Sequence, residues 1–289
     1  MKKSFKENRA AGLTVIALIY LSAAIGGIFI YNVLSVHYLL KIFIADVIMT
    51  VYVFVFSCVF HNASVYDPYW SVAPPVILIS LAFSFQVSPL TILLLVCVLI
   101  WAIRLTANWV YTFSGFKYED WRYRMLRDKT DNLYPFVNFI GIHMFPTLVV
   151  FGCILPATAA FSETAQLNLL SILGVIVCLS SVLLQTMSDV EMHSFRKLKT
   201  GGLINTGLWK YSRHPNYLGE IGMWWGVYFI VLFSIPRLWY LFFGALLNTL
   251  MFIFISIPMA DKRQSKKEGW ADRKSQTHAL LPLPIFLKK

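Results

Sequence analysis

Eight apolar segments, separated by short polar stretches, follow one another along the whole chain. They cover residues 11–31, 42–60, 71–85, 90–111, 136–160, 167–188, 217–233 and 238–258. Their apolar residues are continuous, whereas the strands of a membrane β-barrel alternate apolar and polar residues over roughly 10 positions. A helix needs about 20 apolar residues to cross a bilayer. The pattern therefore predicts an all-α fold, a polytopic transmembrane helical bundle of seven to eight spans.

The third segment, residues 71–85, makes the number of spans uncertain between seven and eight. It is shorter than the others and carries Pro74 and Pro75 near its start. Proline removes a backbone hydrogen bond from a helix interior and bends or breaks the helix. We expect this segment to be tilted, interrupted or re-entrant, and the count is seven if it does not cross the membrane.

Composition and charge exclude a soluble protein and indicate how the chain is oriented. The 289 residues are 58% hydrophobic and only 13% charged, and 25 Lys and Arg against 14 Asp and Glu give a net charge of +11. The basic residues gather at 2–9, 117–129, 196–213 and 262–289. Basic loops stay on the cytoplasmic side. We expect an integral membrane protein, of the inner membrane if bacterial, with these clusters facing the cytoplasm and no nucleic-acid partner.

The four cysteines carry no sign of a metal site. They all lie inside apolar segments without paired spacing, at Cys58, Cys97, Cys153 and Cys178. Buried cysteine without a spacing motif behaves as a small hydrophobic residue. The sequence therefore predicts no bound metal.

A stripe of polar residues continues the sixth segment beyond its apolar part. If the helix continues, Gln185, Asp189, His193 and Arg196 follow at intervals of three or four residues, on one face. An amide, a carboxylate, an imidazole and a guanidinium can together bind a ribose, a ring amide and phosphates. The alternative is an amphipathic helix at the membrane surface whose Arg196 reaches toward water.

A second polar face opens the seventh segment. Pro215 suits the first turn of a helix, where its missing N–H has no partner in any case. The free N–H groups of such a helix start, with Arg213 and His214 beside them, would suit a phosphate. The polar residues expected on this face are Arg213, Asn216, Tyr217 and Glu220. Alternatively, Arg213 is a membrane anchor, Tyr217 an interfacial aromatic residue and Glu220 one member of a buried ion pair.

Two further positions are candidates for contact with a substrate. Asp67 lies in the turn before the third segment, and Trp101 lies near the end of the fourth. An ionisable residue at the edge of a span is a functional candidate. Helix capping and membrane anchoring explain these residues equally well.

These blocks, in this order, resemble the steroid 5-alpha-reductase family, and best its bacterial branch of largely unassigned substrate. The resemblance rests on residues 66–71, 101–104, 119–127, 188–197, 207–225 and 279–282. It implies a seven-span bundle that holds NADPH in a cavity facing the cytoplasm and reduces the carbon–carbon double bond of a lipophilic enone. Residues 1–40 would then be an extra N-terminal span in a single transmembrane domain, and residues 160–289 the cofactor-binding core.

The resemblance also assigns roles by position. Asp67 falls where the family has an acidic residue near the substrate carbonyl, and Trp101 where steroid-reducing members have a tyrosine. Tyr217 would flank the substrate with them. The residues expected to bind the cofactor are Gln185, Asp189, His193, Arg196, Arg213, His214, Asn216 and Glu220.

Together these observations predict a membrane-embedded NADPH-dependent reductase of an enone or sterol-like lipid. The expected partners are a lipophilic small molecule and membrane lipid, with no obligate protein partner. Two alternatives remain open. One is an S-adenosylmethionine-dependent membrane methyltransferase of the prenylcysteine or phospholipid type, which has a similar block around Arg213. The other is a transporter or lipid-binding protein without catalysis.

Overall fold

The computed structural model describes residues 5–164, 166–199 and 201–281, so Pro282 of the closing motif lies outside the described residues. Within them the chain is helical, and the strand-like pairing between Ser212 and His278 is an isolated bridge. The α-helices are α1 (Arg9–Val33), α2 (Tyr38–Phe60), α3 (Tyr69–Ser84), α4 (Pro89–Thr112), α5 (Trp121–Thr130), α6 (Tyr134–Val137), α7 (Phe145–Ala159), α8 (Leu169–Lys197), α9 (Pro215–Ser234), α10 (Phe243–Met251), α11 (Ile257–Gln264) and α12 (Trp270–Gln276).

Seven helical segments of the described chain are long and apolar enough to cross a membrane, which confirms the all-α polytopic bundle. They are Arg9–Val33, Tyr38–Phe60, Pro89–Thr112, Trp121–Ser162, Leu169–Lys197, Pro215–Ser234 and Pro236–Gln264. Two of these join shorter helices through π-helical turns, Asn138–Met144 and Phe252–Ser256. The protein is therefore an integral membrane protein.

The eighth apolar segment forms α3, which is helical but short. Its 16 residues extend roughly 24 Å at 1.5 Å per residue, less than the hydrocarbon core of about 30 Å. The expected interruption at Pro74 and Pro75 is absent, because α3 is continuous through both prolines. They lie in its second turn, so the carbonyls that lose a hydrogen bond belong to the first residues of the helix.

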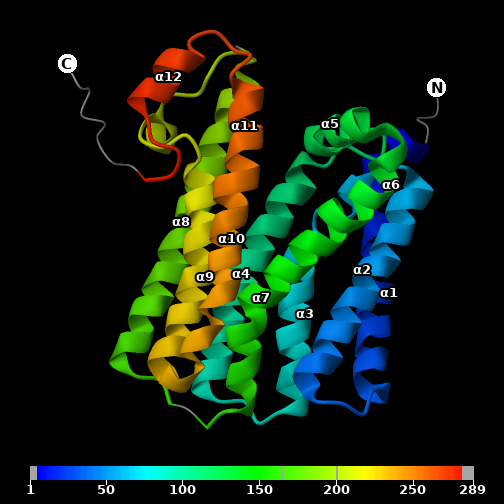
Figure 1. Cartoon of the computed structure of the whole chain (residues 1–289), viewed down its shortest axis with the longest axis vertical. Coiled ribbons are helices and arrows are strands. Elements are labelled where there is room, and N and C mark those ends of the chain that lie inside the picture. The colour runs from blue at the N-terminus through cyan, green and yellow to red at the C-terminus, as the bar shows by residue number, and fades with distance from the viewer. Residues whose placement is uncertain (1–4, 165, 200, 282–289) are drawn as a thin grey trace. The chain divides into compact units, whose positions relative to one another are not determined.

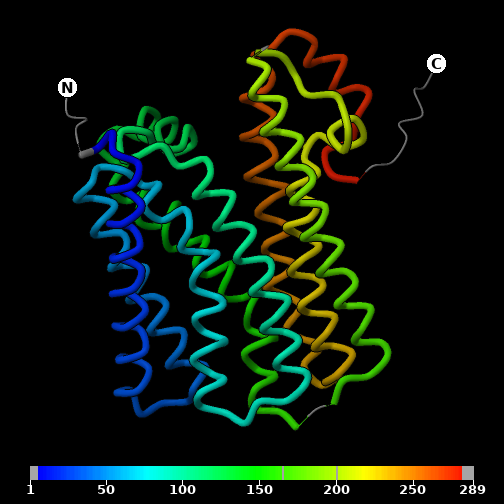
Figure 2. Tube along the Cα trace, turned by 180° about the vertical axis from the view of Figure 1, so that it is seen from behind, coloured from blue at the N-terminus to red at the C-terminus, as the bar shows by residue number. Residues whose placement is uncertain are grey.

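The chain divides into two compact units, an N-terminal unit of Met1–Gln166 and a C-terminal unit of Leu167–Lys289. In the N-terminal unit, α1 lies alongside α2, and α3 packs against α4 and α7 (Figures 1 and 2). The core beneath α1 is rich in aromatic residues, among them Tyr20, Tyr66, Tyr69 and Phe113.

In the C-terminal unit, α8 and α9 form the tightest pair, and α10 and α11 run beside α9 (Figure 1). The pair approaches closely because small residues line its contact. A Cβ atom at Gly226 would lie 2.8 Å from the backbone nitrogen of Cys178, and one at Gly174 would lie 2.5 Å from that of Ile230. Only glycine allows backbones to come this close.

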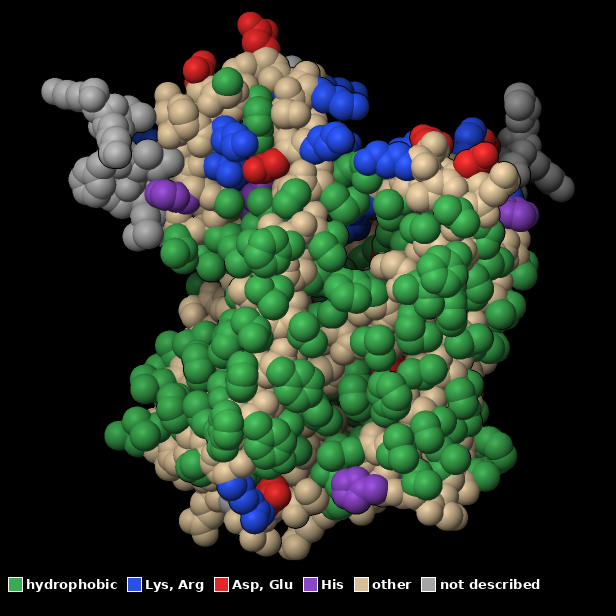
Figure 3. Space-filling view, in the orientation of Figure 1, with side chains coloured by type: hydrophobic (Ala, Val, Ile, Leu, Met, Phe, Trp, Pro, Cys, Tyr) green, Lys and Arg blue, Asp and Glu red, His purple; other side chains and the backbone are tan. Residues whose placement is uncertain are grey.

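The surfaces of both units match a membrane environment. In the face shown in Figure 3, hydrophobic side chains cover the flank of each unit, and most charged side chains gather toward one end. In the C-terminal unit this end contains the last turns of α8, the loop before α9, the end of α11 and α12. We call this region the polar end of the C-terminal unit.

Candidate functional site

The predicted stripe on α8 lies on one continuous helix, because α8 extends to Lys197. Asp189 and His193 are half-buried in its last turns, and Arg196 is exposed. Gln185 is 1% exposed, yet neither its amide nitrogen nor its amide oxygen has a hydrogen-bond partner. A buried amide without partners costs free energy, so Gln185 marks a place where a polar ligand group would be stabilised.

α9 begins at Pro215, as the sequence predicts, and brings a second amide close to the first. The Oδ1 atom of Asn216 is buried and has no partner. One turn later comes Gly219, where an added Cβ would lie 2.5 Å from Cγ of Gln185. The two unsatisfied amides therefore border the same contact between α8 and α9.

Glu220, the next predicted residue on α9, is buried within this helix pair. Its Oε1 accepts a hydrogen bond of 3.0 Å from the indole nitrogen of Trp224, one turn further along. Glu220 is 6% exposed. A buried carboxyl group needs such donors to offset the cost of leaving water.

Arg213 and His214 meet one carboxylate, that of Asp261 in the middle of α11. Nη2 of Arg213 lies 3.2 Å from Oδ2 of Asp261, and Nε2 of His214 lies 2.8 Å from Oδ1. The three side chains are largely buried. Nε of Arg213 is buried without a partner, so the guanidinium keeps one donor for another group.

The C-terminal residues 277–279 cover the chain just before α9 and occupy its backbone N–H groups. The backbone nitrogens of Arg213 and His214 donate to the carbonyls of His278 and Ala279, each at 3.0 Å. Nη1 of Arg213 also donates to the carbonyl of Thr277. The backbone N–H groups of Arg213 and His214 are therefore not available to a ligand, because the chain's own carbonyls already accept their hydrogens, and phosphate binding at the start of α9 itself stays a prediction.

Tyr217, predicted to flank the substrate, belongs to the same cluster. Its ring stacks on that of His214 with centroids 5.1 Å apart, and it contacts Phe252 at 4.8 Å. The stack fixes the imidazole against Asp261.

Positively charged groups crowd together at two places in the polar end. Lys267 donates a hydrogen bond of 2.7 Å to the carbonyl of Gly202. Burial lowers the pKa of Lys267 from its ordinary value, and the positive charges of Arg263 and Arg196 lower it further. We call these three residues the first cationic cluster; Arg196 and Arg263 are exposed, and a polyanionic ligand would pair with their positive charges.

The second cationic cluster pairs Arg273 of α12 with Arg213. Burial lowers the pKa of Arg273 and the charge of Arg213 lowers it further. Nη2 of Arg273 is buried without a hydrogen-bond partner. The second cluster thus offers free donors on Arg213 and Arg273, and both clusters lie at the polar end of the unit.

The loop between the clusters is fixed to α8 by two contacts. Oε2 of Glu191 accepts a hydrogen bond of 2.9 Å from the backbone nitrogen of Leu208, and the indole of Trp209 donates to the carbonyl of Ser188 at 3.0 Å. Gly207 between them has a φ of +55°, and a Cβ there would collide with the Glu191 carboxylate. This position therefore requires glycine.

The N-terminal unit contains the other two predicted residues, Asp67 and Trp101. Oδ1 of Asp67 accepts a hydrogen bond from the hydroxyl of Tyr123 in α5 at 2.5 Å. Burial raises the pKa of Asp67 to about 7, although Arg122 nearby acts in the opposite direction. Asp67 therefore exchanges a proton near neutral pH. Trp101 is completely buried in α4.

A buried chain of hydroxyl groups continues inward from Tyr66. Its hydroxyl lies 2.7 Å from Oγ1 of Thr147, which lies 2.9 Å from Oγ1 of Thr50. The ring of His143 packs against Tyr66 at 4.6 Å, and its Nε2 has no partner. This chain consists of hydroxyl groups, whereas the polar end of the C-terminal unit carries cations.

Five residues of these clusters were not predicted from the sequence. Asp261, Arg263 and Lys267 lie in the basic stretch that opens the tail, Arg273 lies in α12, and Tyr123 lies in the charged helix α5. The signal available for Asp261 was its position as the one acidic residue among Met259–Arg263. Nothing in the local pattern indicates which distant residue each would meet.

A comparison with family models finds one match that covers more than three quarters of the chain. The model is described as "Protein of unknown function (DUF1295)", and it matches residues 53–277. No curated protein matches the chain, and no solved structure does. The matched range contains both cationic clusters and the buried amides of α8 and α9.

Proposed function

Because the chain belongs to the DUF1295 family and gathers cations and unsatisfied amides at one end of its C-terminal unit, we propose that it is a membrane-embedded NADPH-dependent reductase. Its substrate would be a lipophilic enone or sterol-like lipid with a reducible carbon–carbon double bond. The resemblance of its sequence blocks to the steroid 5-alpha-reductase family supports the reaction type. The main observation in support of a bound NADPH is the pair of cationic clusters.

The charge of the clusters favours a dinucleotide phosphate over S-adenosylmethionine. NADPH has three phosphate groups, and Arg196, Arg263 and Lys267 would hold one part of them while Arg213 and Arg273 hold another. S-adenosylmethionine has a positive sulfonium and a single carboxylate. Two separate groups of mutually repelling cations suit several anionic groups far better than one.

The unsatisfied amides would hold the uncharged part of the cofactor. Both side-chain atoms of Gln185, and Oδ1 of Asn216, are buried without partners, so a ring carboxamide or ribose hydroxyl bound there would satisfy them. Asp189 and His193 lie one and two turns further along α8 and would contact a ribose. Bound NADPH would supply a hydride to the β-carbon of the enone.

Asp67 is the proposed proton-holding group on the substrate side. Its carboxyl oxygen Oδ1 is positioned by Tyr123, and a pKa of about 7 leaves a large fraction of this group protonated at neutral pH. A protonated carboxyl can donate to a carbonyl oxygen and stabilise negative charge that develops there. Trp101 would contribute apolar surface and an N–H donor, and Tyr217 would hold the imidazole of His214.

A thermal-shift experiment on the full-length protein in detergent tests the proposal. NADPH at a hundred times its dissociation constant stabilises a folded protein by about 2.7 kcal/mol, so we expect the unfolding temperature to rise by roughly 5–10 °C. The double variant Arg196→Ala/Lys267→Ala should lose this rise. Consumption of NADPH on addition of a lipophilic enone then tests the reaction itself.

The matched control removes one exposed arginine elsewhere in the unit. Arg237 lies before α10, and Arg237→Ala should keep the full response to NADPH. Stabilisation by S-adenosylmethionine alone would overturn the proposal in favour of a methyltransferase. A response to neither cofactor would leave a transporter or lipid-binding protein.

A further inference from the structure

A cavity lies between α1, α2 and α3 in the N-terminal unit, away from the residues assigned above. Its volume is about 80 Å³, and 17 residues line it. Ten of these residues precede residue 53, where the match to the family model begins. The cavity is therefore built mainly by the part of the chain that the family model leaves out.

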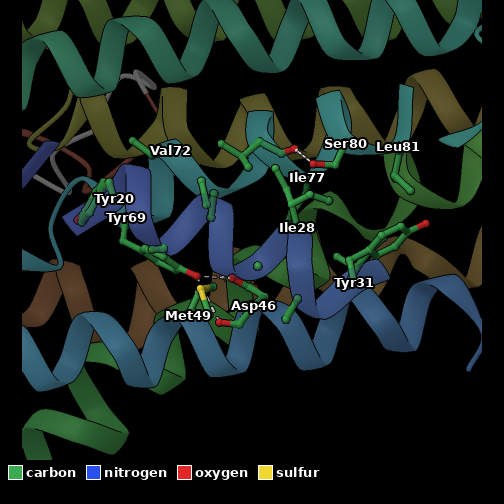
Figure 4. A pocket seen from close by; sticks show the side chains of 17 residues that line it. Tyr20, Ile28, Tyr31, Asp46, Met49, Tyr69, Val72, Ile77, Ser80 and Leu81 are labelled. Carbon is green, nitrogen blue, oxygen red and sulfur yellow. Dashed lines mark hydrogen bonds between the residues drawn. The ribbon is translucent and has the colours of Figure 1, made fainter. Parts of the chain in front are cut away.

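The walls are almost entirely apolar and are formed by three helices. α1 contributes the small residues Ala23, Ala24 and Gly27, which leave the space open, and α3 contributes Val72 and other aliphatic side chains (Figure 4). α1 and α2 are membrane-spanning helices by length and composition. The molecules able to reach such a cavity from the bilayer are lipophilic.

One polar pair interrupts the apolar wall. Asp46 of α2 is 8% exposed, and its Oδ1 accepts a hydrogen bond of 2.8 Å from the hydroxyl of Tyr69 of α3. Both residues line the cavity, and Figure 4 shows them meeting across it. The structure gives no partner to the second carboxyl oxygen of Asp46 among the described residues. A carboxyl group at membrane depth with a free oxygen is costly unless a ligand completes its hydrogen bonds.

The cavity is elongated along the helices. Its lining on α1 extends from Tyr20 to Tyr31, a span of roughly 17 Å at 1.5 Å per residue. Tyr20 and Tyr69 lie toward one end, Asp46 lies nearer the middle, and Tyr31 with Ser80 lies toward the other end (Figure 4). This shape suits a narrow apolar chain whose polar group reaches Asp46.

We propose that this cavity binds a lipid alcohol, a single apolar chain with one hydroxyl group, taken from the surrounding bilayer. A hydroxyl both donates and accepts, so it matches the free oxygen of Asp46 whether or not that oxygen carries the proton. A carbonyl matches only the protonated form. A phospholipid headgroup is excluded, because its charge would be buried beside a carboxyl group.

Photolabelling of the full-length protein in detergent tests this site without any cofactor. The probe is hexadecanol carrying a diazirine in its chain, and labelled peptides are located by mass spectrometry. We expect saturable labelling of α1, α2 and α3 at the cavity. Unlabelled hexadecanol should compete, and hexadecane should compete about tenfold less well, because it lacks the hydrogen bond to Asp46.

Three variants separate the cavity from general attraction to an apolar surface. Ala24→Leu should abolish saturable labelling by filling the space, and Asp46→Leu should raise the concentration for half-saturation about tenfold. Val55→Ala, on the exposed side of α2 and outside the lining, should label like the wild type. Equal labelling of Ala24→Leu and wild type would overturn the site, as would competition by hexadecane equal to that by hexadecanol.

This result is independent of the proposed reductase. The NADPH response of the C-terminal unit should be unchanged in Ala24→Leu. Labelling at the cavity in a protein that ignores NADPH would support the lipid site alone.

Discussion

The two units handle polar groups in opposite ways. In the N-terminal unit the buried polar groups are hydroxyls and carboxyls that bond one another, such as Tyr66 with Thr147 and Tyr69 with Asp46. In the C-terminal unit the polar end instead carries cations that are exposed or only partly buried, and Asp261 lies between Arg213 and His214.

The difference indicates two kinds of ligand for one membrane protein. Neutral hydrogen-bonding groups in apolar walls select an uncharged lipophilic molecule. Crowded cations with spare donors select a polyanion. A reductase of a lipid with a dinucleotide cofactor needs both environments. Matched substitutions in the two units test this difference.

The largest effect is expected at the contact between α8 and α9. Gly226→Ala would place a Cβ 2.6 Å from Sγ of Cys178 and 2.8 Å from its backbone nitrogen. Overpacking of this kind costs about 3 kcal/mol at the upper end of its usual range. We expect the unfolding temperature in detergent to fall by roughly 6–12 °C.

A glycine-to-alanine substitution in the N-terminal unit, at Gly141, should cause no loss of stability. A Cβ at Gly141 would meet only Cγ1 of Val137, at 3.9 Å. Gly141→Ala should leave the protein unchanged or slightly more stable, because alanine loses less entropy in a helix. Equal losses at Gly226 and Gly141 would show that the close helix contact is not what holds α8 and α9.

Removal of the shared carboxylate of the C-terminal unit should have the next largest effect. Asp261→Asn leaves Arg213 and His214 without their negatively charged partner, and we expect a loss of about 2 kcal/mol, as for other buried charge-assisted hydrogen bonds. The unfolding temperature should fall by roughly 4–8 °C. Asp272→Asn, at an exposed position of α12, is the control, and an equal effect there would contradict the role of Asp261.

In the N-terminal unit, stability should depend on pH through Asp67. Its pKa is about 7 in the folded protein against an ordinary value of 3.8, so the folded state holds this proton more tightly than the unfolded state. The contribution to stability is fully present below about pH 4 and is lost as the pH rises through 7.

Comparison of wild type and Asp67→Asn across this range measures that contribution. The unfolding temperature of the wild type should fall relative to that of Asp67→Asn by a few degrees as the pH rises from 5 to 8. Asp128→Asn, exposed on α5, should follow the wild type. If the difference in unfolding temperature between wild type and Asp67→Asn did not change with pH, the Asp67 carboxyl group would have its ordinary pKa.

The smallest effect is expected at the surface of α5. Arg127 pairs with Glu119 at 2.9 Å, but its side chain is 40% exposed. Exposed ion pairs contribute between zero and about 1 kcal/mol, so Arg127→Gln should lower the unfolding temperature by no more than about 3 °C. If Arg127→Gln lowered the unfolding temperature as much as Asp261→Asn, the ion pairs of the two units would contribute equally to stability, contrary to the account.

The local elements followed from the sequence, because each depends on residues close together. Apolar runs predicted the membrane helices, and Pro215 predicted the start of α9. The polar stripe depended on a continuous helix, and α8 meets this condition because it extends through Arg196. Pro74 and Pro75 misled only because they fall in the second turn of α3, where a helix tolerates them.

The partners of the candidate residues did not follow from the sequence. Asp261 meets His214 across 47 positions of sequence, and Tyr123 meets Asp67 across 56. Periodicity reports which face a residue occupies and says nothing about which distant element covers it. For the same reason the closure of residues 277–279 over the start of α9 was missed, although Arg213 and His214 themselves were identified.

The most direct test of the account is a fluorescence titration of NADPH into the purified wild-type protein, the Arg196→Ala/Lys267→Ala variant and the Ala24→Leu variant. The account predicts saturable binding to the wild type and to Ala24→Leu with equal affinity, weakening as salt concentration rises, and at least a tenfold loss in the double variant. Absence of saturable binding to the wild type, or equal affinity in the double variant, would contradict the claim that the cationic end of the C-terminal unit is a dinucleotide site.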